Sequence, residues 1–177
     1  MNKSVFLDRD GTIIVDKVYL NDPDQIEFLP NAIQGLKSFV EMGFKLYVAT
    51  NQSGVPRGKV TLENLHEIHR RIGEACNKHG IQIEKFYYAP YMTDSNHPMR
   101  KPNPGMLLEA GKEFGVDFKN SWMIGDKMID VEAGHAAGAR SILLTTSKED
   151  PSKSNFTPPE YVAQDLLDCA NFIKKHL

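Results

Sequence analysis

Short apolar runs alternate with amphipathic stretches along the whole chain. The apolar runs predict buried strands over residues 4–7, 44–49, 83–89, 121–125 and 141–145. Between and after them, apolar residues at helical spacing predict helices over residues 32–42, 62–79, 104–114, 128–137 and 165–176. Asn31, Thr61 and Asn103 are the expected N-caps of three of these helices, and a proline follows Asn103 at the first helical position. The Ser-, Pro- and Lys-rich segment 147–159 is expected to be a surface loop.

Strand–helix alternation of this kind predicts a doubly wound α/β fold, in which helices cover both faces of a parallel sheet. The chain has 177 residues, so we expect residues 1–177 to form a single domain. In such sheets, ligands bind at the carboxyl ends of the strands. The residues directly after each strand are therefore the candidates for function.

Composition narrows the classes of partner. The chain holds 21 Lys and Arg against 23 Asp and Glu, a net charge of −2, so no broad basic face is expected and no nucleic-acid partner. Cys76 and Cys169 stand far apart and outside any CxxC motif, which favours a reducing, cytoplasmic location with two buried thiols. No apolar run approaches the ~18 residues of a membrane span, and the first is too short for a signal peptide. We therefore expect no membrane partner.

Two carboxylates follow the first strand. Asp8 comes directly after three apolar residues, and alternate residues project to the same side, so Asp8 and Asp10 could face one pocket. Such a pair is costly unless a cation or a proton lies between the two carboxylates. The alternative interpretation is an Asp-Gly turn in which Asp10 only hydrogen-bonds the backbone.

Polar residues also follow the next three strands. Residues 50–54 offer hydroxyls, amides and a glycine turn suited to an oxyanion. Arg100 and Lys101 precede a helix start, where the helix dipole also favours an anion. Asp126 and Asp130 lie one helical turn apart after the fourth strand. Each feature alone has an ordinary explanation: a polar loop, a solvated basic pair and a helix cap.

Together, the four strand ends predict one anion and one hard cation at the same edge of the sheet. Carboxylates from Asp8, Asp10 and Asp126 suit Mg²⁺, which prefers oxygen ligands. Thr50 and Lys101 suit the non-bridging oxygens of a phosphoryl group. Phosphoryl transfer needs mainly positioning and charge stabilisation, which such a site supplies.

With these residues in place, the sequence resembles the haloacid-dehalogenase (HAD) phosphatases. DxDGT at residues 8–12, Thr50, Lys101 and GDxxxD at residues 125–130 match the motifs of that superfamily in order. More closely, it resembles the group of D-glycero-D-manno-heptose 1,7-bisphosphate phosphatases and histidinol-phosphatases. The stretches that carry this resemblance are FLDRDGTI, TNQSGVPRG, RKPNPGML and MIGDKMIDVEAG.

The resemblance implies a role for each matched residue. Asp8 would be the nucleophile that forms an aspartyl-phosphate, and also a ligand of Mg²⁺. Asp10 would protonate the leaving alcohol and then deprotonate the attacking water, while its backbone carbonyl binds Mg²⁺. Thr50 and Lys101 would hold the transferred phosphoryl group.

The remaining implied roles concern the metal and the rest of the substrate. Asp126 would complete the metal site, and Asp130 would support the metal or Lys101 from behind. The residues expected to touch the rest of the substrate are Asp16, Lys17, Val18, Tyr19, Asn51, Gln52, Ser53, Arg100 and Lys127.

Two stretches depart from the group's pattern. Close relatives carry a zinc loop with Cys and His ligands where this chain has APYMTDSNHPM, residues 89–99. That stretch holds no cysteine, and its lone His97 is expected to be a surface residue rather than a zinc ligand. Heptose-specific members also tend to have a glycine near Val18. Both departures leave the chemistry intact and the substrate open.

The expected function is therefore a Mg²⁺-dependent phosphatase for a small sugar or polyol phosphate, with D-glycero-D-manno-heptose 1,7-bisphosphate as the best candidate. Histidinol phosphate or another phosphomonoester is the alternative substrate. We expect a monomer without a large cap domain, its site roofed only by loops 15–29 and 92–100. A phospho-accepting receiver domain is the alternative from another class, although receivers place the accepting Asp after the third strand. A catalytically idle scaffold is a further alternative.

Overall fold

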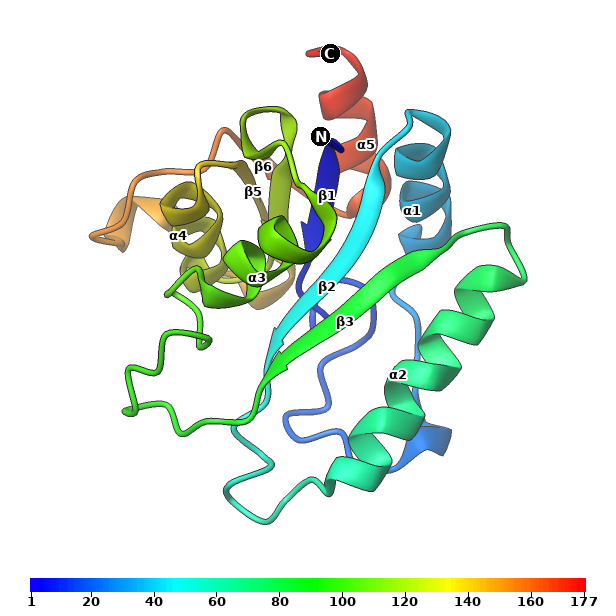
Figure 1. The fold of residues 1–177 in the computed structure, drawn as a ribbon, viewed down its shortest axis with the longest axis vertical. Helices are drawn as coiled ribbons and strands as arrows, with labels where there is room; N and C mark the ends of the chain where they lie inside the picture. Colours follow the sequence, from blue (N-terminus) through cyan, green and yellow to red (C-terminus); the bar gives the residue numbers. More distant parts are fainter.

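The computed structural model describes residues 1–177, and its centre is one parallel sheet (Figure 1). The six strands run in the order β3-β2-β1-β4-β5-β6. Their bounds are β1 Ser4–Leu7, β2 Lys45–Asn51, β3 Ile83–Ala89, β4 Trp122–Gly125, β5 Arg140–Leu144 and β6 Tyr161–Ala163. The five predicted strands are confirmed within one or two residues at each end. The sequence pattern missed β6, because a three-residue strand beside a polar loop has no periodicity to detect.

Five helices complete the predicted alternation. They are α1 Ala32–Glu41, α2 Leu62–Asn77, α3 Gly105–Phe114, α4 Met128–Ala137 and α5 Leu166–Lys174. Short 3-10 turns η1 to η4 lie at Pro23–Gln25, Phe118–Asn120, Thr145–Ser147 and Pro151–Lys153. The expected surface loop at 147–159 begins at the last residue of η3, holds η4, and contains no α-helix or strand.

The capping predictions had mixed outcomes. The Thr61 hydroxyl accepts a hydrogen bond from the backbone N–H of Asn64 at 3.1 Å, so this N-cap is confirmed. Asn31 is the N-cap residue of α1 as predicted, but its side chain makes no capping hydrogen bond: the backbone is left-handed, and Nδ2 donates to Asp165 at 2.8 Å. The prediction for Asn103 was wrong: α3 begins one residue later with Pro104 as its N-cap, and the Asn103 amide binds the preceding loop.

Alternating side chains of β1 face two separate cores. Val5 and Leu7 belong to a cluster of 24 buried residues that includes side chains of α1, α2 and α5. Phe6 points the other way, into a cluster of 10 buried residues that includes side chains of α3. Helices therefore cover both faces of the sheet, α1, α2 and α5 on one and α3 and α4 on the other (Figure 1), as predicted.

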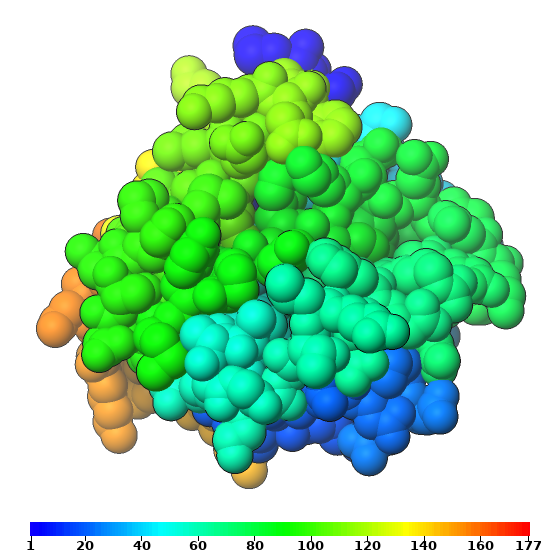
Figure 2. Space-filling model, turned by 60° about the horizontal axis from the view of Figure 1, so that its bottom comes forward, coloured from blue at the N-terminus to red at the C-terminus, as the bar shows by residue number.

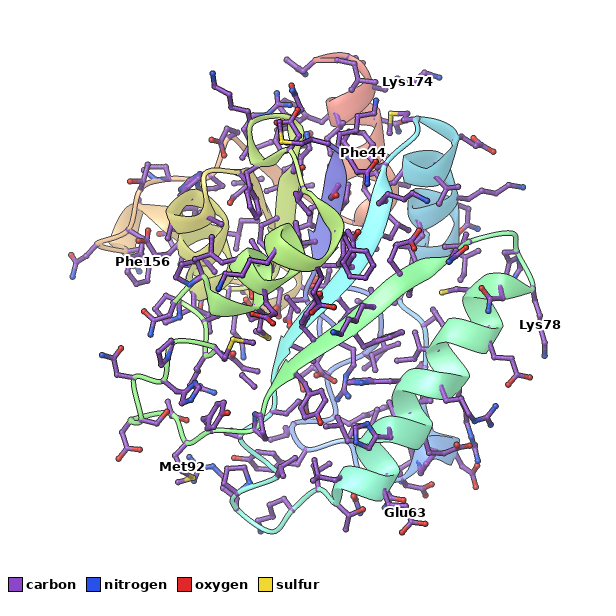
Figure 3. All side chains as sticks on the ribbon, viewed as in Figure 1. Phe44, Glu63, Lys78, Met92, Phe156 and Lys174 are labelled. Carbon is purple, nitrogen blue, oxygen red and sulfur yellow. The ribbon has the colours of Figure 1, made fainter.

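The strand register brings the residues after the strands together. Leu7 pairs with Val48 of β2 and with Ile124 of β4, so Asp8 lies level with Gly125, where β4 ends, and two residues before the end of β2 at Asn51. Figure 3 shows the polarity of the sheet, with Phe44 just before β2 at one end and Met92 beyond β3 at the other. The long segments 8–31 and 90–104 are loops at the carboxyl end. None of the helices is both long and apolar enough to span a membrane.

Candidate active site

A cavity of about 410 Å³ opens at the carboxyl edge of the sheet. Figure 2 shows this end of the molecule, where the loop after β2 (cyan) meets the loop after β3 (green). The lining residues are Asp8, Asp10, Asp16, Val18, Tyr19, Asn51, Gln52, Ser53, Gly54, Thr93, Arg100, Lys101, Lys127, Ile129 and Asp130. Most residues of the predicted site therefore meet at one cavity.

Lys101 is the centre of the buried charge in this site. Its Nζ donates to Asp8 Oδ1 at 2.9 Å, to Asp130 Oδ1 at 2.6 Å and to the backbone carbonyl of Ala49 at 2.7 Å. Burial alone would lower the pKa of Lys101, but the carboxylates of Asp130 and Asp8 raise it above its usual range. The ammonium is therefore fully charged at neutral pH, and its three N–H groups are all used.

Three carboxyl groups cluster in this part of the site, and two of them, Asp8 and Asp130, contact the Lys101 ammonium. Oxygen atoms of Asp8, Asp126 and Asp130 lie within 4.8 Å of one another, and all three residues are buried. Burial and the neighbouring charges of Asp8 and Asp130 raise the pKa of Asp126 to about 8. With all three carboxyl groups ionised, one ammonium would leave two negative charges uncompensated, which is why the pKa of Asp126 is raised in the absence of a further cation. A divalent cation would neutralise them.

One oxygen of Asp126, Oδ1, is both fully buried and without a hydrogen-bond partner. This is costly for a carboxylate unless a cation binds it. Gly11 leaves room beside this carboxylate, because a side chain at that position would collide with Asp126. The donor set is made of hard oxygens, as Mg²⁺ requires. Asp126 and Asp8 therefore fit a magnesium ion.

Asp130 differs from Asp126 in that both of its oxygens are occupied by protein donors. Its Oδ1 accepts from Lys101, and its Oδ2 accepts from the backbone N–H of Lys127 at 3.0 Å. The arrangement suits the supporting role that the sequence predicted for Asp130. It fixes Lys101 and the start of α4 relative to each other.

Asp10 lies at the cavity wall and is held from the protein side. Arg9 donates to both of its oxygens, through Nη2 at 3.0 Å and Nε at 3.1 Å, and Gln52 Nε2 donates to Oδ2 at 3.2 Å. Burial raises the pKa of Asp10, and the charge of Arg9 opposes that shift. The alternative of a purely backbone-bonding Asp-Gly turn does not describe this carboxylate, whose side-chain partners are Arg9 and Gln52.

Thr50 and Asn51 organise the end of β2. Thr50 is fully buried behind the cavity, and its hydroxyl accepts a hydrogen bond from Gln52 Nε2 at 2.9 Å. The Asn51 side chain binds the backbone of Lys101 twice, from Nδ2 to the carbonyl and from the N–H to Oδ1, each at 3.0 Å. Asn51 thus fixes the position of Lys101 as well as lining the cavity.

Eight of the nine residues expected to touch the rest of the substrate line this cavity. Lys17 does not: its ammonium pairs with Glu27 at 2.9 Å on the surface. Gly54 and Thr93, from the segments 50–54 and 92–100 that were expected at the site, also line the cavity, and so does Ile129, which sequence reasoning missed. Ile129 could have been found from its place directly before Asp130 at the start of a predicted helix.

The loop in place of the zinc loop is held by protein contacts. His97 is half-buried rather than on the open surface: its ring stacks on Tyr91 with centroids 3.5 Å apart, and its Nδ1 accepts from the N–H of Met99 at 3.1 Å. The Asn103 amide donates to the carbonyl of His97 at 3.0 Å, and Arg100 donates to the carbonyl of Tyr91 at 3.4 Å. These contacts fix the loop that carries Arg100 to the cavity.

Comparison with known proteins identifies the class. A model of the HAD-hydrolase-like family matches residues 98–169. The D-glycero-beta-D-manno-heptose-1,7-bisphosphate 7-phosphatase of Pasteurella multocida is 32% identical over 180 residues, which cover 98% of each chain. The Escherichia coli K12 protein of the same name is 34% identical over 186 residues, 97% of this chain and 94% of that relative.

Comparison with solved structures also finds a heptose bisphosphate phosphatase. The D,D-heptose 1,7-bisphosphate phosphatase of B. bronchiseptica, complexed with magnesium and phosphate, superposes with a TM-score of 0.90 at 26% identity over 99% of both chains. The chain belongs to the HAD-like family of phosphatases, as the motifs predicted, and is a phosphoric monoester hydrolase. The Pasteurella multocida and Escherichia coli relatives, which the chain matches over nearly their whole length, are both named heptose bisphosphate phosphatases.

Proposed function

We propose that this chain is a Mg²⁺-dependent phosphatase that acts on a small phosphorylated sugar through an aspartyl-phosphate. D-glycero-β-D-manno-heptose 1,7-bisphosphate is the first candidate substrate, because full-length relatives carry that activity in their names. The observation that carries the proposal is the geometry at Asp8. One oxygen accepts from Lys101, the other has no hydrogen-bond partner in the protein, and the residue lines the cavity. A buried carboxylate held by one oxygen is free to attack with the other.

The first half-reaction uses Asp8 and Asp10. The free Asp8 oxygen attacks phosphorus, the bond from phosphorus to the ester oxygen breaks, and the proton of Asp10 goes to the leaving alcohol. The Lys101 ammonium, bound to the other Asp8 oxygen, orients the nucleophile and offsets negative charge on the phosphoryl oxygens.

The second half-reaction returns the enzyme to its starting state. Asp10 takes a proton from a water molecule as that water attacks phosphorus, the Asp8–phosphorus bond breaks, and inorganic phosphate leaves. Asp8 and Asp126, together with the backbone carbonyl of Asp10, would hold Mg²⁺. When bound, the ion supplies charge neutralisation for the phosphoryl oxygens. Asp130 keeps Lys101 in place throughout.

The rest of the cavity wall would select the substrate. Asp16, Val18 and Tyr19 come from the loop after β1, Ser53 from the loop after β2, and Arg100 from the loop after β3. Together with Asn51, Gln52 and Lys127 they offer both cationic and polar groups to a phosphorylated polyol. We further propose that the chain acts as a monomer in the cytoplasm on a small phosphorylated metabolite.

A substrate panel tests the proposal. The purified chain with Mg²⁺ is expected to release phosphate from p-nitrophenyl phosphate and, with higher kcat/KM, from heptose 1,7-bisphosphate; histidinol phosphate is the comparison substrate. EDTA or Asp8→Asn should abolish turnover. Stoichiometric phosphorylation without turnover would instead identify a receiver-like switch, and undiminished turnover in Asp8→Asn would remove the nucleophile assignment.

A further inference from the structure

Arg9 is a buried cation that the proposed reaction does not itself use. It lies between Asp8 and Asp10 in the chain, yet only 1% of its surface is exposed. Its Nε and Nη2 form a two-point contact with the Asp10 carboxylate, at 3.1 and 3.0 Å. Its third described contact, from Nη1, is to His69 Nε2 at 3.1 Å. The guanidinium thus bridges the end of β1 and helix α2.

His69 must receive this hydrogen bond as an acceptor. A guanidinium has only N–H donors, so Nε2 of His69 carries the lone pair and its proton is on Nδ1. Burial and the charge of Arg9 lower the pKa of His69 to about 3, which agrees with a neutral ring. The ring is stacked on Phe86 of β3, with centroids 4.7 Å apart and planes at 17°. His69 is therefore a fixed acceptor rather than a titrating group.

The contacts with Asp10 have a clear direction. The buried Arg9 and Gln52, the residue after β2, both donate to the carboxylate of Asp10, which lines the cavity. A two-point contact between two planar groups fixes the rotation of the carboxylate as well as its distance. A proton donor in such a site acts only when its oxygen reaches the leaving group.

We propose that Arg9 and His69 are positioning residues for the acid–base group: His69 holds Arg9, and Arg9 holds the Asp10 carboxylate toward the leaving-group oxygen. The inference rests on the proposed function, because it assumes that Asp10 protonates the leaving alcohol. Neither residue touches the substrate. Without the contact of His69 with Arg9, or of Arg9 with Asp10, the Asp10 carboxyl group can rotate away from the leaving-group oxygen. Proton transfer to that oxygen then becomes slower or has to come from water.

If Arg9 and His69 position Asp10, their replacement should lower kcat/KM by a factor that depends on the leaving group of the ester. An alkyl phosphate needs a proton on its departing oxygen, whereas p-nitrophenolate is stable without one. Values of kcat/KM report the steps up to the aspartyl-phosphate and omit its hydrolysis, so they isolate this proton transfer. We expect His69→Leu and Arg9→Met to lower kcat/KM for β-glycerol phosphate by about 10–100-fold, the usual weight of such supporting contacts, and for p-nitrophenyl phosphate by less than about threefold.

The conservative variants provide the matched controls. His69→Gln keeps an acceptor for Arg9 and should restore most of the β-glycerol phosphate activity, whereas Arg9→Lys keeps the charge without the two-point contact and should not. His66→Leu changes an exposed histidine of the same helix that does not touch Arg9, and should match the unaltered chain. Where Arg9→Met fails to fold, the comparison of His69→Leu with His69→Gln decides alone.

Equal losses with both esters, or full β-glycerol phosphate activity in His69→Leu, would overturn the inference. Failure of the proposed function is distinguishable from this result. In that case the unaltered chain would not hydrolyse either ester, or Asp10→Asn would lower kcat/KM for β-glycerol phosphate and for p-nitrophenyl phosphate by the same factor. If Asp10→Asn shows the leaving-group effect and the Arg9 and His69 variants do not, Asp10 is the acid and these two residues do not position it.

Discussion

Removal of the Lys101 charge tests how the buried charges of the site support one another. In Lys101→Met, the carboxylates of Asp8 and Asp130 lose an ammonium at 2.9 and 2.6 Å. At an effective dielectric constant of about 20, each such contact has a gross attraction of several kcal/mol. The side chains of both partners are largely buried, so the two carboxylates would remain without compensation. Breaking a buried pair in this way costs about 3–5 kcal/mol of unfolding free energy.

The destabilisation should depend on pH with a defined sign. Burial raises the pKa of Asp130, and Lys101 opposes that shift; without Lys101 the pKa of Asp130 rises further. A carboxyl group whose pKa is raised in the folded state stabilises the protein below its unfolded pKa, and this stabilisation is lost as pH rises through the folded pKa. The difference between Lys101→Met and the unaltered chain is therefore larger at pH 8 than at pH 5.

Urea denaturation in EDTA at pH 5 and pH 8 measures this difference. Lys59→Met, at an exposed lysine, is the control and should lie within about 0.5 kcal/mol of the unaltered chain at both pH values. A cost below about 1 kcal/mol for Lys101→Met at pH 8, or a cost that does not grow with pH, would refute the reasoning from the buried charges.

Three other expectations concern catalysis, metal binding and the cavity mouth. Asp10→Asn should lower kcat by about 10²–10⁴-fold in steady-state assays; less than a twofold change would exclude its role. Because the pKa of Asp126 is raised from 3.8 to about 8, the melting temperature in EDTA should fall between pH 5 and pH 8 and recover with Mg²⁺; a flat profile would contradict this. Val18 has a left-handed backbone with φ 70°, so Val18→Gly should add about 0.5–1 kcal/mol of unfolding free energy; urea denaturation that shows a loss would contradict the strain.

The sheet and the main residues at its carboxyl edge could be predicted because their signals are local. Asp8 directly follows a buried strand, and Asp126 another, so the parallel register alone brings them together. Thr61 is an N-cap in the structure because its partner lies three residues away. The N-cap position of Asn31 could be predicted as well, but its side-chain partner could not, because Asp165 is 134 residues distant.

The residues that hold the site residues in place also could not be predicted from the sequence pattern. His69 occupies an apolar face of α2, where a histidine gives no sign that it meets a guanidinium from the end of β1. Arg9 looks like an exposed loop residue until the fold places it inside. The course of loop 90–104 depends on the stack of Tyr91 with His97, and both residues lie outside any helix or strand. Long-range side-chain contacts of this kind have no periodicity.

The central claim is that Asp8 carries the phosphoryl group during turnover. The most direct measurement mixes the chain with p-nitrophenyl phosphate and Mg²⁺, stops the reaction with acid within one turnover, and reduces the protein with borohydride, which converts an aspartyl-phosphate to homoserine. Peptide mass spectrometry should find homoserine at position 8 only when substrate is present, and Asp10→Asn should increase its amount. An unmodified Asp8 during full turnover, or homoserine at another position, would contradict the account.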